Sequence, residues 1–115
     1  MAKPKITGEY RITWMEQWDM DFLDLEVRAF IHIKANRTGQ FQFGLVTGSM
    51  DCRFMKRDGK PAVEFSWDGM DEMDPICGRG WALLEGDELQ GHLFIHSGDD
   101  SAFRAKRVRT NRTRR

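Results

Sequence analysis

The first candidate for chemistry is an acidic stretch, WDGMDEMDP, at residues 67–75. Its carboxylates supply the hard oxygen ligands that Ca²⁺ and Mg²⁺ prefer. Their order, D-x-x-D-E-x-D, lacks the alternate acidic positions, central glycine and final glutamate of an EF-hand loop. We therefore expect no metal here but a solvated connection, with Met70 and Met73 capping one end of the fold; the alternative is a pocket rim beside Trp67. The four acidic residues are Asp68, Asp71, Glu72 and Asp74.

The histidines and glycines do not match a catalytic or phosphate-binding pattern. His92 and His96 are four residues apart on an expected strand, so they lie about 13 Å apart on one face. The turn HSGDDS, from His96 to Ser101, holds the residue types of a hydrolytic triad, but such groups converge from separate segments. Gly78 and Gly80 precede a strand, whereas a phosphate loop opens a helix. The sequence favours a protein that is not an enzyme and needs no cofactor.

The composition indicates one ordinary domain. The chain has 115 residues, of which 40% are hydrophobic and 31% charged, the balance of a soluble globular protein. No apolar run approaches the roughly 18 residues of a membrane span, and the first residues lack the apolar stretch of a secretory signal. Cys52 and Cys77 are too distant in sequence for a CxxC motif and fit free thiols. We expect a cytoplasmic location without membrane contact.

Aromatic residues are the most informative candidates for binding. The chain has four Trp and eight Phe, and most should be core. A barrel of eight strands is either filled by side chains or holds one small ligand. We expect Trp18 and Trp67 to flank one mouth of such a barrel and to bind a small, partly apolar molecule there; a filled barrel without ligand is the alternative. The predicted ligand-binding residues are Trp18, Phe43, Arg53, Glu64, Trp67, Asp68 and Trp81.

Alternating apolar and polar residues predict the strands that must position these side chains. Residues 8–15 place Tyr10, Ile12 and Trp14 on one face, and residues 16–24 break the alternation as one or two helical turns, with Asp19 or Asp21 near the N-terminus. Turns are expected at 36–39, at 47–49, at the Asp-Gly of 58–59 and at 70–78. The expected strands are 8–15, 25–35, 40–46, 50–56, 62–69, 79–85, 89–97 and 102–108.

Together these elements predict an all-β fold. About eight strands form an antiparallel up-and-down meander that closes into a small barrel, with one short helix between the first two strands. A flattened barrel or a two-sheet sandwich is the alternative. Residues 8–108 form the single domain, after a flexible lead (1–7) and before a disordered basic tail (109–115).

The polar faces of the expected strands are predicted to point outward, because the apolar set is larger. If they pointed inward, they would form a polar cavity with an Arg53–Glu64 pair across the 58–59 hairpin. The polar set comprises Arg28, His32, Gln42, Arg53, Glu64, Ser66, Gln90 and His92.

The pattern resembles the calycin type of barrel, the class of lipocalins and fatty-acid-binding proteins. An aromatic-bearing first strand after a glycine, GEYRITW, and the meander of short hairpins carry this resemblance over residues 8–107. The lipocalin G-x-W signature is missing, since Tyr10 stands where Trp would. The runs FGLVTGSMDCRF, EFSWDGMDEMDP, GRGWA and FIHSGDDSAF are also similar to short bacterial proteins, which implies a fold and no activity.

Basic residues gather at the C-terminus. Residues 104–115 hold seven basic residues and no acidic one, whereas residues 1–103 hold 11 basic and all 18 acidic residues, a net charge of −7. Such a run could contact phosphates, but no aromatic follows Phe103 to stack on bases. Binding of nucleic acid or an acidic protein surface is therefore an alternative function, and contact between one copy's tail and another's acidic body would give a homo-oligomer. The basic residues are Arg104, Lys106, Arg107, Arg109, Arg112, Arg114 and Arg115.

Overall fold

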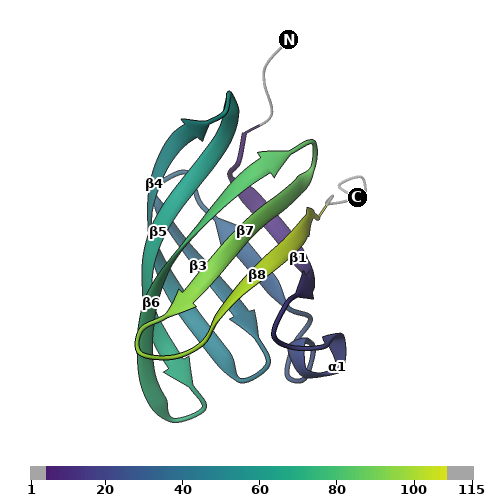
Figure 1. Ribbon diagram of the computed structural model, residues 1–115, viewed down its shortest axis with the longest axis vertical. Helices are drawn as coiled ribbons and strands as arrows, with labels where there is room; N and C mark the ends of the chain where they lie inside the picture. The colour runs from purple at the N-terminus through teal and green to yellow at the C-terminus, as the bar shows by residue number, and fades with distance from the viewer. Residues whose placement is uncertain (1–4, 109–115) are drawn as a thin grey trace, which may run out of the picture.

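Eight antiparallel strands close into a barrel in the computed structural model, which describes residues 5–108 (Figure 1). Each strand pairs with the next, and the first pairs with the last, so the backbone groups of the ring find partners without a free edge. The predicted all-β meander and its closure are confirmed. The strands are β1 (Gly8–Met15), β2 (Phe30–Ile33), β3 (Thr38–Phe43), β4 (Val46–Arg57), β5 (Lys60–Asp71), β6 (Asp74–Glu85), β7 (Glu88–Ile95) and β8 (Asp100–Arg107).

A short helix, α1 (Met20–Leu23), lies between β1 and β2 as expected, at the end of the barrel opposite the start of β1 (Figure 1). Asp19 caps it by accepting a hydrogen bond from the Phe22 backbone N–H at 3.1 Å. Leu23 is buried, and the Phe22 ring occupies the space where a side chain at Gly44 would lie. The helix therefore closes this end of the barrel.

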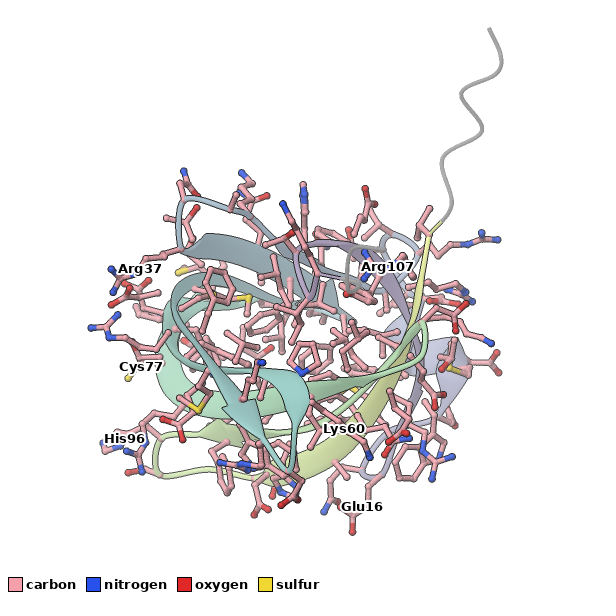
Figure 2. All side chains as sticks on the ribbon, turned by 90° about the horizontal axis from the view of Figure 1, so that it is seen from above. Glu16, Arg37, Lys60, Cys77, His96 and Arg107 are labelled. Carbon is pink, nitrogen blue, oxygen red and sulfur yellow. The ribbon has the colours of Figure 1, made fainter. Side chains whose placement is uncertain are left out.

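The interior is filled by phenylalanine rings that lie over glycines on the neighbouring strand. If each glycine carried a Cβ, that atom would lie only 2.4, 2.5 or 2.8 Å from the nearest atom of the facing phenylalanine ring. Each ring therefore occupies the space of a missing side chain. The void among the interior side chains is about 10 Å³, about the smallest volume that holds one water molecule. Seen along the barrel, side chains fill the space inside the strands (Figure 2). The pairs are Phe41 with Gly48, Phe65 with Gly80 and Phe103 with Gly91.

The second strand is shorter than predicted, because α1 ends in a reversal of the chain. The Asp24 carboxylate accepts a hydrogen bond from the Ala29 backbone N–H at 2.9 Å, and β2 begins only at Phe30. Leu25 and Val27 are exposed, although they continue the apolar alternation of the strand. Their alternation extended the expected strand into this bend.

Trp14 lies outside the barrel. The alternation had predicted it inside, on the same face as Tyr10 and Ile12. The register of β1 against β8 shifts between Ile12 and Trp14, which turns the following side chains to the other face. Trp14 is 44% exposed, with the Arg104 guanidinium 5.4 Å from its ring centre, and Met15 takes the buried position.

Two expected turns are placed differently. The chain turns at Gly44, which has a φ of +57°, and residues 47–49 belong to β4; Gly48 serves the Phe41 ring and not a turn. The acidic stretch is not a long loop, because β5 runs to Asp71 and β6 starts at Asp74. Glu72 and Met73 alone connect them, as a tight hairpin.

Residues 5–7, the described part of the lead predicted at 1–7, contact the barrel. Ile6 is buried, and its carbonyl accepts a hydrogen bond from the Tyr10 hydroxyl at 2.7 Å. Arg107 donates to the carbonyls of Lys5 and Thr7 at 2.5 and 2.9 Å. Burial raises the pKa of Tyr10 to about 12, so this phenol remains a hydrogen-bond donor. Residues 1–4 and the tail at 109–115 lie outside the described residues.

Candidate functional site

An open groove of about 520 Å³ lies on the outer face of β4, β5, β6 and β7. It forms where a small residue, Ser66, stands among larger outward side chains on the flanking strands. The strand register sets Ser66 between Asp51 on β4 and Arg79 on β6, with Phe94 beyond on β7. The lining residues are Asp51, Arg53, Glu64, Phe65, Ser66, Arg79, Gly80, Trp81 and Phe94.

A second row of outward side chains runs beside the first and supplies the other wall. Arg53 lies opposite Glu64, and Glu64 lies opposite Trp81, which in turn faces His92. Residues two apart on a strand share a face at a spacing of about 7 Å, so the two rows are neighbours. The groove is thus bordered by charged side chains on β4 and β5, by Arg79 and Trp81 on β6 and by Phe94 on β7.

Ion pairs cancel most of the charge of the groove. Arg53 binds the Asp51 carboxylate at 3.0 Å, and Arg57 binds Glu64 at 3.4 Å while its guanidinium lies 5.0 Å from the ring centre of Trp81. Arg79 is exposed and makes no hydrogen bond, ion pair or ring contact with any residue of the described part of the chain. One uncompensated positive charge therefore remains, at Arg79.

Trp81 and Phe94 form the aromatic wall of the groove, and a polar contact between β7 and β8 lies beside Phe94. His92 Nε2 lies 2.5 Å from Asp100 Oδ2, and the His92 ring centre is 4.7 Å from that of Phe94. Phe94 is 42% exposed, whereas Phe41, Phe43, Phe65 and Phe103 are buried in the core. The wall thus offers apolar area to a ligand.

The structure separates the predicted ligand-binding residues into two sets on opposite sides of the barrel wall. Arg53, Glu64 and Trp81 line the outer groove. Trp18 is partly buried and packs against the core, with its ring centre 5.1 Å from that of the buried Phe43. Trp67 lies in the core, 5.0 Å from Phe41, and Asp68 is exposed on the outer face in a shallow depression beside it. The seven residues do not form one site.

The predicted residues are separated because successive side chains on a strand point to opposite sides of the barrel wall. On β5, Phe65 and Trp67 point inward while Glu64, Ser66 and Asp68 point outward, so Trp67 and its acidic neighbour cannot face the same ligand. The predicted set combined residues of both faces. The expectation that the polar face points outward is confirmed, because every member of the polar set is exposed or partly exposed.

The Arg53–Glu64 pair also differs in detail from the prediction. The two residues are register partners across the hairpin, as expected, but their ion pairs are with Asp51 and Arg57. The aromatic and unpaired groups that complete the groove, Phe94 and Arg79, were not among the predicted site residues. The signal for Arg79 was its position two residues before Trp81, which places both side chains on one face.

The described residues of the basic C-terminal set contact the barrel itself. Arg104 lies over the Trp14 ring, Lys106 Nζ is 3.9 Å from an Asp87 carboxylate oxygen, and Arg107 holds the residues before β1. Arg109, Arg112, Arg114 and Arg115 lie outside the described residues. The three described cations are therefore already engaged, and binding of nucleic acid through this set stays a prediction.

The remaining candidates for chemistry are dispersed over the barrel. Burial raises the pKa of the Cys52 thiol to about 11, and Asp51 adds to that rise; Cys77 is exposed. Cys77 and His96 both point away from the barrel wall (Figure 2). Among residues 5–108, no group of three His, Cys, Asp or Glu side chains could hold a metal ion.

Comparison with models of protein families, with curated proteins and with solved structures gave no match for this chain. The resemblance to calycin barrels and to short bacterial proteins therefore stays a prediction, as does the cytoplasmic location. In the part of the chain that the structure describes, no helix has the length and apolar character needed to cross a membrane.

Proposed function

We propose that this protein is a binding protein for a small, partly apolar molecule, and that the outer groove on β4–β7 is its binding site. One observation carries the proposal: the groove brings two aromatic side chains, the exposed Phe94 and the partly exposed Trp81, next to Arg79, which has no partner among the described residues. Apolar walls with a few polar groups that fix orientation are typical of small-molecule sites.

The volume of the groove supports this proposal. About 520 Å³ falls within the roughly 300–1,000 Å³ of known ligand pockets. The filled interior supports a site on the outer face, because a void of about 10 Å³ has no room for an organic molecule. Because Asp51 and Glu64 are in ion pairs, Trp81 and Phe94 supply the apolar contact area of the groove.

The proposal is tested by titrating the protein with small aromatic probes, indole and 2-naphthalenemethanol, and following backbone amide shifts by NMR. We expect saturable shifts that map to the groove-lining segments, around residues 51–53, 64–66, 79–81 and 94. Ser66→Leu fills the floor of the groove from the outside and should weaken binding about tenfold or more, because a ligand then lacks the space beside Arg79.

Ser49→Leu is the matched control, since Ser49 is also exposed on the outer face but does not line the groove. This variant should bind the probes as the unmodified protein does. Shifts that map to another part of the barrel, or binding that Ser66→Leu leaves unchanged, would remove the groove as the site.

A further inference from the structure

Building on the proposed binding function, we propose that the groove selects an aromatic molecule with a single negative charge, whose carboxylate binds Arg79 while its ring lies against Phe94 and Trp81. The proposal adds the chemical class of the ligand to the location of the site. It is carried by the distribution of charge in the groove and by the strand register that places its three binding groups.

The charge of the groove suits a ligand with one negative charge. Asp51 and Glu64 already accept from Arg53 and Arg57, so a ligand anion has one available cation, the Arg79 guanidinium. A guanidinium binds a carboxylate through two parallel N–H donors, which fixes the orientation of a flat ligand. The Ser66 hydroxyl, the register partner of Arg79, is free to donate a further hydrogen bond.

The register then directs the rest of the ligand onto the aromatic wall. Phe94 is the direct cross-strand partner of Arg79, which places their Cβ atoms about 5 Å apart. Trp81 follows Arg79 by two residues on β6, about 7 Å along the same face. A ring attached to a carboxylate at Arg79 thus reaches both aromatic side chains, one across the strand and one along it.

The same charges disfavour a polyanion such as a nucleic-acid strand. Asp51 and Glu64 line the groove, and Asp100 stands directly opposite Phe94 in the register of β7 and β8. A second or third phosphate would find no further unpaired cation among the described residues of the groove, because Arg53 and Arg57 are already paired with Asp51 and Glu64. The groove therefore discriminates by the number of negative charges on the ligand as well as by its ring.

The test compares 2-naphthoate with 2-naphthalenemethanol, which has the same rings and no charge, in NMR titrations of the whole chain. We expect 2-naphthoate to bind about tenfold more tightly, the ratio that one charged hydrogen-bonding pair supplies. Arg79→Gln should reduce that ratio to near one. Arg28→Gln is the matched control, because Arg28 is also exposed, lies outside the groove and should leave the ratio unchanged.

The outcomes separate this inference from the proposed function. Equal binding of both probes at the groove would overturn the selection for an anion while the groove remains a binding site. Absence of both from the groove would overturn the proposed function and this inference together. Tighter binding of a short oligonucleotide than of 2-naphthoate at the same residues would overturn the single-charge selection in favour of a polyanion.

Discussion

At the scale of single residues, Asp24 has the most contacts of any carboxylate described above. One oxygen accepts from the Arg11 guanidinium at 3.0 Å, and the other accepts from the Ala29 backbone N–H at 2.9 Å. These hydrogen bonds, first from Arg11 and then from Ala29, hold the pKa of Asp24 below its ordinary value of 3.8. Asp24 therefore ties the end of α1 to β1 and to the start of β2 in its ionised form.

Asp24→Asn should lower the free energy of unfolding by about 1–2 kcal/mol at neutral pH, since a partly exposed charged acceptor is lost. A carboxyl whose pKa is lowered by folding stabilises the fold above its unfolded pKa and ceases to do so as the pH falls through its folded pKa. The difference between variant and unmodified protein should thus be constant above about pH 5 and shrink below about pH 4. Denaturant unfolding from pH 2.5 to 7 measures it.

Glu26→Gln is the control for this experiment, because Glu26 is exposed and has no hydrogen bond or ion pair among residues 5–108. It should change the unfolding free energy little at any pH. A destabilisation by Asp24→Asn that persists undiminished at pH 2.5 would show that the amide disturbs packing and not charge.

At the scale of the strands, the Phe–Gly pairs explain both the curvature and the solidity of the barrel. In each pair the phenylalanine ring fills the space that two ordinary side chains would occupy, because glycine has no side chain. Neighbouring strands can therefore curve inward around the core. Each pair joins strands that follow one another in the chain, β3 with β4, β5 with β6 and β7 with β8. The same device thus recurs around the barrel.

Gly48→Ala should destabilise the protein by about 1–3 kcal/mol, because the new Cβ lies 2.4 Å from the Phe41 ring and the crowding must be relieved. Phe41→Leu frees that space, so the cost of Gly48→Ala should be smaller in the Phe41→Leu background. A double-mutant cycle by denaturant unfolding measures the coupling. Gly98→Ala, whose nearest contact is Ile95 Cγ2 at 3.1 Å, is the control and should cost less. Strictly additive effects would contradict the pairing.

At the scale of the whole molecule, the interior of the barrel is filled by side chains and does not form a ligand cavity. Its ends are closed by α1 and by Ile6, and the void lined by its core residues is about 10 Å³. A molecule with a filled interior has its outer wall left for recognition, which is where the groove lies. The closing contact between β1 and β8 joins residues as far as 97 apart in sequence, Tyr10 and Arg107.

Leu93→Ala tests the packing of the interior, because Leu93 lines the small void. We expect a loss of about 2–5 kcal/mol in unfolding free energy, from lost burial and the enlarged cavity. The cavity should then bind xenon, detected by shifts of core methyl groups, whereas the unmodified protein should not. Leu83→Ala, on the outer face, should cost less and bind no xenon; xenon binding by the unmodified protein would contradict a filled barrel.

The amino-acid sequence by itself determined the number of strands, the meander order and the outward polar face, because these depend on neighbouring residues: the period of two and the turn residues between strands. It also placed Asp19 or Asp21 near the helix N-terminus, and the structure shows that Asp19 is the cap. The tertiary structure alone decided how Arg79 and Phe94 come beside Trp81, why Trp67 belongs to the core, and why Trp14 lies outside. Those outcomes depend on register, bulges and the glycine opposite each ring, which couple residues on different strands, and a shift of one residue moves a side chain to the other side of the wall.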